Sequence, residues 1–106
     1  MAREFRSSSR VPLELPVHVR WKTRTGKYRH AEGMTGNMSG NGLFLVIRPR
    51  LGRNTPIAFR LDLPTEITKV PVTLLGEGHI VRHSGPQEMP GVAAVIDSYE
   101  LQRADA

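Results

Sequence analysis

The chain has 106 residues, enough for one domain, and its formal charge at pH 7 is +5. That charge is concentrated at one end: residues 1–30 hold eight basic and two acidic side chains, a net of +6, whereas residues 31–106 have a net of −1. The absence of cysteine excludes thiol catalysis, disulfides and every Cys-ligated zinc or iron–sulfur site. We therefore expect an anionic partner that meets the N-terminal part of the chain.

Hydropathy excludes a helical membrane anchor. No apolar run approaches the roughly 20 residues that a membrane-spanning helix needs, and the first residues lack the apolar stretch of a secretory signal. We therefore expect a soluble, cytoplasmic domain without membrane insertion. Aromatic residues make up 6% of the chain, which disfavours a surface built from many base-stacking rings.

The N-terminal part divides into a polar segment and a long strand. The first ten residues lack periodicity and hold a serine run between two arginines. We expect residues 1–10 to be a flexible switch segment that binds a ligand, ahead of a domain over 11–106. From Val11, apolar and polar residues alternate strictly as far as Lys22, which predicts a half-buried strand. Pro16 cannot donate to a ladder, so it indicates an edge position or a bulge.

Short strands joined by tight turns follow. A hairpin turn near residues 25–26 leads to a polar strand around 28–35, and a glycine- and asparagine-rich turn over 36–42 precedes a strand over 43–47. Alternation returns over 57–63, 70–75, 79–82 and 92–96. Because no window has a sustained helical apolar stripe, the pattern predicts an all-β fold, a small antiparallel barrel or sandwich.

The tail over residues 97–103 has the pattern of a short helix. Asp97 and Ser98 are favoured N-cap residues, because their side-chain oxygens accept from the first free N–H groups of a helix. Tyr99 and Leu101 would then need an apolar surface to pack on. The predicted barrel therefore includes a short C-terminal helix.

Two motifs stand in a fixed order relative to the strands. Arg6 and Arg10 lie directly before the first predicted strand, and the stretch Asn37-Met-Ser-Gly-Asn-Gly42 follows about thirty residues later. This combination, RxxxR followed by [DN]xSxxG, resembles the signature of PilZ domains, bacterial receptors for the second messenger cyclic di-GMP. The resemblance covers nearly the whole chain, as in a stand-alone PilZ domain. It implies a six-stranded antiparallel β-barrel.

The resemblance also implies where the ligand binds. Known members hold cyclic di-GMP between the arginine segment and the turn, so the binding positions in this chain would be Arg6, Arg10, Asn37, Ser39 and Gly42. A guanidinium can grip guanine O6 and N7 or stack on the base. An asparagine amide can match the guanine edge, a serine hydroxyl can donate to a phosphate, and glycine permits close backbone approach.

The implied mechanism is a coupled ordering of the N-terminal segment. Ordering each backbone residue costs about 1–2 kcal/mol, whereas one bidentate arginine–guanine contact contributes about 1–3 kcal/mol. Two such contacts do not order the whole segment, so phosphate pairing and stacking must add to them. The ordered segment would present a new surface to an unknown downstream partner protein. Phe5 stands where many members have another arginine, so we expect one cyclic di-GMP per site.

Other functions have weaker support in the sequence. It contains no Walker loop, GxSxG or HExxH pattern, so we expect a binding protein and not an enzyme, with no cofactor beyond its ligand. His79 and His83 would lie about 13 Å apart along a strand, so we expect no metal site. The alternative function is a small basic barrel that binds single-stranded nucleic acid, which the scarce aromatic residues and the localised charge disfavour.

Overall fold

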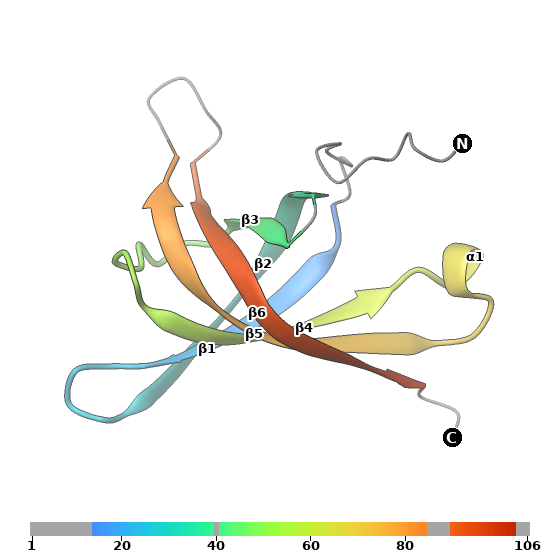
Figure 1. The fold of residues 1–106 in the computed structure, drawn as a ribbon, viewed down its shortest axis with the longest axis horizontal. Coiled ribbons are helices and arrows are strands. Elements are labelled where there is room, and N and C mark those ends of the chain that lie inside the picture. Colours follow the sequence, from blue (N-terminus) through green and yellow to red (C-terminus); the bar gives the residue numbers. More distant parts are fainter. Residues whose placement is uncertain (1–13, 40, 85–89, 104–106) are drawn as a thin grey trace.

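The computed structural model describes residues 14–39, 41–84 and 90–103. It confirms the all-β prediction: six antiparallel strands close into a barrel in the order β1-β2-β3-β6-β5-β4 (Figure 1). The strands are β1 (Pro16–Lys22), β2 (Tyr28–Ser39), β3 (Gly42–Val46), β4 (Pro56–Leu63), β5 (Val72–His83) and β6 (Val92–Arg103), with one turn of helix, α1 (Thr65–Thr68), between β4 and β5. Over the described ranges, no helix has the length and apolar character needed to cross a membrane.

The barrel interior is filled by side chains that alternate along the strands. In β1, Val17 and Val19 are buried and the residues between and beside them are exposed. The same period of two places every second residue of β4 in the core. The core cluster consists of Leu15, Val17, Val19, Leu43, Leu45, Leu51, Ile57, Phe59, Leu61, Ile80, Val92 and Ala94. Full burial of one large apolar side chain contributes about 1.5–3 kcal/mol, so this alternation decides which face of each strand points inward.

β1 closes the barrel because it pairs with β2 along one edge and with β4 along the other. Val17 stands opposite Leu61 and Val19 opposite Phe59, which joins strands that are distant in sequence. Pairing with β4 begins at Val17, so Pro16 lies at a local edge of the sheet, as its missing N–H predicts.

β6 replaces the expected C-terminal helix, so that prediction is wrong. Residues 97–103 continue the strand, and residues 98–103 pair with β5. Asp97 caps no helix; it is the extra residue of a β-bulge between Ile96 and Ser98, and its Oδ2 lies 3.0 Å from His79 Nδ1. A long neighbouring strand offers a complete hydrogen-bond ladder, whereas an isolated helix of this length is unstable in water. Tertiary pairing therefore overrides the capping pattern.

β5 is one strand where the sequence predicts two, over 70–75 and 79–82. Gly76 and Gly78 interrupt the apolar alternation, and both lie where another part of the chain approaches closely. A Cβ on Gly76 would overlap the Phe59 ring, and one on Gly78 would overlap the Val95 carbonyl. The two glycines therefore permit close packing within a continuous strand.

Alanine at Gly76 tests this packing. The new Cβ would overlap the Cζ atom of the Phe59 ring, which is only 3% exposed, so the ring would have to shift within the core. We expect Gly76→Ala to lower the free energy of unfolding by about 1–3 kcal/mol, measured by urea denaturation. The matched control is Gly52→Ala, whose new Cβ would have Thr55 Oγ1 at 3.8 Å as its nearest neighbour. Equal midpoints for the two variants would contradict the close contact.

Candidate functional site

The five sequence-predicted binding positions fall on two segments. Arg6 and Arg10, with the whole segment 1–10, lie outside the described residues. Asn37, Ser39 and Gly42 are described, and they lie together on the β2–β3 hairpin. The hairpin is therefore the part of the predicted site whose geometry is available.

The connection of the β2–β3 hairpin has fewer residues than the seven-residue turn that the sequence predicts. β2 continues through Ser39, which pairs with Gly42, so residues 40 and 41 connect the two strands. Asn37 and Ser39 therefore belong to a strand and not to a seven-residue turn. The connection is joined to β6, because the Ile96 N–H donates to the Asn41 carbonyl with an N···O distance of 2.7 Å.

A β-bulge in β2 takes Asn37 out of the regular alternation. The register shifts between Thr35 and Met38, so that Gly36 and Asn37 together oppose Phe44. Thr35 is buried and Met38, three residues later, also packs against the core. The extra residue lets both side chains face inward, and Asn37, on the bulge between them, is half-buried.

Gly36 is needed beside this bulge. The Phe44 ring packs against it, and a Cβ on Gly36 would lie 2.7 Å from ring atom Cδ2. The same ring would be 2.9 Å from a Cβ on Gly91, which precedes β6. The Phe44 ring thus packs against both glycines, and it joins the bulged part of β2 to the start of β6.

The first described residues attach to β2 beside the bulge. The Leu15 N–H donates to Thr35 Oγ1, and the Thr35 N–H donates to the Leu15 carbonyl, each with a donor–acceptor distance of 2.9 Å. Thr35 is 1% exposed and Leu15 is 7% exposed, so water does not compete for these groups. We term the pair of hydrogen bonds the Leu15–Thr35 clasp. It fixes the path of the chain into β1 two residues away from Asn37 in sequence.

The basic residues of the β1–β2 hairpin lie at the other end of β2. The β1–β2 hairpin projects from the barrel (Figure 1) and carries Arg20, Lys22, Arg24, Lys27 and Arg29. Asn37 lies nine positions after Tyr28 along β2, about 30 Å at 3.3 Å per residue. The Debye length in physiological salt is about 8 Å. These cations are therefore screened from the Asn37 end of the strand.

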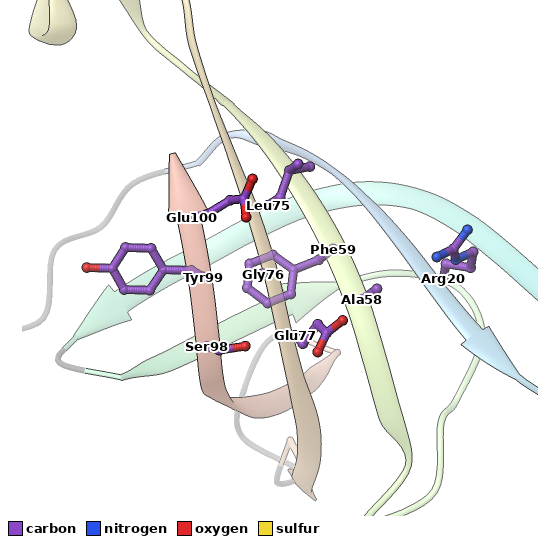
Figure 2. A pocket seen from close by; sticks show the side chains of 9 residues that line it. All are labelled: Arg20, Ala58, Phe59, Leu75, Gly76, Glu77, Ser98, Tyr99 and Glu100. Atoms are coloured by element: carbon purple, nitrogen blue, oxygen red, sulfur yellow. The ribbon is translucent and has the colours of Figure 1, made fainter. Parts of the chain in front are cut away.

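A hollow on the outer wall of β4, β5 and β6 has the wrong charge for a dinucleotide. Its volume is about 510 Å³, and Figure 2 shows the lining residues Arg20, Ala58, Phe59, Leu75, Gly76, Glu77, Ser98, Tyr99 and Glu100. The side chain of Ala58 is small, which leaves space between the larger side chains around it. Glu77 and Glu100 outnumber Arg20 there, so the hollow disfavours a phosphodiester.

The histidines considered as metal ligands have other partners. His79 Nδ1 contacts Asp97, as described above, and His83 Nε2 lies 2.6 Å from the Leu51 carbonyl oxygen. In the described part of the chain, no three His, Asp or Glu side chains gather as a metal site requires. Comparison of the chain with protein-family models, with curated proteins and with solved structures gave no match. The candidate site is therefore defined by geometry alone: the β2 bulge, the hairpin connection and the Leu15–Thr35 clasp.

Removal of the Thr35 hydroxyl tests the clasp. Thr35→Val keeps the shape of the side chain and leaves the buried Leu15 N–H without its acceptor, so we expect the free energy of unfolding to fall by about 1–3 kcal/mol. Thr73→Val is the control, because Thr73 Oγ1 donates to Asp62 Oδ1 at an exposed position. Urea denaturation should give a much smaller loss for the control. Equal losses would show that burial does not strengthen the clasp.

Proposed function

We propose that this protein is a non-enzymatic, cytoplasmic receptor for cyclic di-GMP, a PilZ-type domain that holds the dinucleotide between its N-terminal arginines and the β2–β3 hairpin. The observation that carries the proposal is the Leu15–Thr35 clasp, which holds Leu15, five residues after Arg10 in sequence, beside the bulge that contains Asn37. The closed six-stranded barrel adds support, because it is the fold that the resemblance to PilZ domains implies.

Chain length allows both arginines to reach the hairpin. Arg10 precedes Leu15 by five residues and Arg6 precedes it by nine. An extended chain spans at most about 3.3–3.6 Å per residue, so these limits are about 17 Å and 30 Å from Leu15. A ligand lying over the bulge is within both limits. The two guanidinium groups can therefore grip it from separate points.

The β2–β3 hairpin supplies a surface that is already ordered before the dinucleotide binds. Asn37 lies on the bulge and is half-buried, so its amide is accessible to donate to and accept from a guanine edge. Ser39 and Gly42 form the last pair before the connection, and the hydrogen bond from Ile96 to Asn41 holds that connection against β6. A surface fixed in this way loses little entropy on binding. Most of the ordering cost then falls on the N-terminal segment.

The clasp also limits how much chain must be ordered. Because Leu15 is already fixed, wrapping has to order only the residues between it and Arg6. Charge-assisted contacts of the arginines with guanine and phosphate offset the cost of about 1–2 kcal/mol per residue. The wrapped segment forms a surface that the free protein lacks, which a downstream partner protein can recognise.

Calorimetric titration with cyclic di-GMP tests the proposal. We expect saturable binding with a stoichiometry near one ligand per chain, and we expect Arg10→Ala to weaken the affinity about tenfold or more, because a bidentate arginine–guanine contact contributes about 1–3 kcal/mol. Asn37→Ala should weaken binding in the same direction.

The control is Arg24→Ala, which removes the same charge from the far end of β2. It should bind as the unmodified protein does, because that position is several Debye lengths from the bulge. Absence of binding heat with the unmodified protein would refute the receptor function. Equal weakening of the affinity by Arg24→Ala and Arg10→Ala would show that the protein only attracts anions in general.

The β1–β2 hairpin favours a second candidate function, binding of single-stranded nucleic acid. The Tyr28 ring is 63% exposed, and the Arg20 guanidinium and the Lys22 ammonium lie 5.1 Å and 5.5 Å from its centroid. An exposed ring among cations offers one stacking platform and several phosphate contacts. A single ring makes this a weaker candidate than the receptor.

Fluorescence anisotropy with a labelled oligonucleotide separates the two functions. Binding through the hairpin would fall steeply with salt, would be weakened by Lys27→Glu, and would be insensitive to Arg10→Ala. A cyclic di-GMP receptor should instead bind the oligonucleotide weakly and keep most of its ligand affinity in Lys27→Glu. Tight oligonucleotide binding without cyclic di-GMP binding would establish the nucleic-acid function and refute the receptor function.

A further inference from the structure

The C-terminal half of β6 has a neighbouring strand along one edge. β3 pairs with β6 from Leu45 opposite Val92 to Gly42 opposite Val95, and its register ends there. β5 pairs with β6 through to its last residue. Among the described strands, none lies along the edge of residues 97–102 that faces away from β5. Figure 1 shows this half of β6 extending away from β3.

Beyond the β-bulge at Asp97 and the charge of Glu100, this edge lacks the features that usually prevent strands from pairing between molecules. Exposed edges are commonly protected by lysine, proline or very short length. Residues 98–102, Ser-Tyr-Glu-Leu-Gln, contain neither lysine nor proline and are all exposed. Tyr99 and Leu101 are 63% and 57% exposed, and they lie on the same side of the strand. Figure 2 shows the Tyr99 side chain pointing away from the hollow that Ser98 and Glu100 line.

We propose that this edge of β6 pairs with the same edge of a second copy of the chain, so that two barrels share an antiparallel sheet. Strand addition of this kind satisfies the main-chain N–H and C=O groups that the edge presents to solvent. Its two-fold symmetry makes the same patch serve both partners. The apolar side chains of the two edges then cover each other, which explains why they lie together on one side of the strand.

The side chains select the register of the pair. With the two-fold axis at Leu101, the two Leu101 side chains meet, Tyr99 stands opposite Arg103 of the partner subunit, and Glu100 stands opposite Gln102 of the partner subunit. Aromatic–cation and carboxylate–amide neighbours are favourable there. A two-fold axis at Glu100 would place two carboxylates directly opposite each other, which is destabilising. The Leu101-centred register therefore defines the proposed dimer.

A single engineered cysteine tests the dimer without background, because the chain has no cysteine of its own. Directly opposed residues in antiparallel strands have Cα atoms about 4.5–5.5 Å apart, within the range of about 4.4–6.8 Å that a disulfide bridges. We expect mild oxidation of Leu101→Cys, without added nucleotide, to give mainly a covalent dimer on a non-reducing gel. The control is Tyr28→Cys, at a position of matching exposure, 63%, on another strand.

Sedimentation equilibrium of the cysteine-free protein completes the test. We expect a monomer–dimer equilibrium that Leu101→Lys shifts to monomer. At concentrations low enough for both proteins to be monomeric, the two thermal midpoints should be equal, because the position is exposed. Cross-linking of Leu101→Cys no faster than Tyr28→Cys, or a monomeric protein at several hundred micromolar, would overturn the proposal. Faster cross-linking of Glu100→Cys than of Leu101→Cys would overturn the stated register. Since no cyclic di-GMP is present, these results are independent of the proposed receptor function.

Discussion

The pairing of β1 with β4 is the interaction on which the rest of the barrel depends. It joins strands that are separated by more than thirty residues, and it turns an open sheet into one without an edge between them. Val17 and Leu61, which oppose each other at this junction, are 1% and 0% exposed. Loss of the pairing would expose both side chains and the strand edges together. The position of β1, once fixed in this way, also determines where the N-terminal chain meets the sheet.

That meeting point connects the fold to the proposed ligand site. The Leu15–Thr35 clasp uses main-chain groups just before β1 and lies next to the β-bulge that contains Asn37. The basic charge of the N-terminal part of the chain is divided accordingly. Arg6 and Arg10 belong to the segment that enters at the clasp, whereas the cations of the β1–β2 hairpin lie at the far end of β2. In the proposed function, the net charge alone would give only general attraction for anions, and the positions of Arg6 and Arg10 would supply recognition.

The sequence predicted the fold class well because apolar alternation in β1 and β4 is a direct consequence of one buried face. It failed where local chemistry and tertiary pairing disagree. Asp97 and Ser98 have good capping side chains, yet β5 offers them a strand partner. Asn37 has turn chemistry, yet a bulge places it within a strand. A bulge depends on the register of the neighbouring strand, and Gly76 is explained only by the Phe59 ring that packs on it. Both depend on a neighbouring strand, so neither can be inferred from the residues of one segment alone.

The central claim is that cyclic di-GMP binds at the bulged end of β2, and an amide NMR titration tests it most directly. We predict that saturating cyclic di-GMP shifts the amide signals of Thr35, Asn37 and Gly42, while those of Lys27 and Tyr28 keep their positions. This result would place the ligand at the hairpin beside the Leu15–Thr35 clasp. Unchanged amides at residues 35–42, or shifts confined to the β1–β2 hairpin, would contradict the claim.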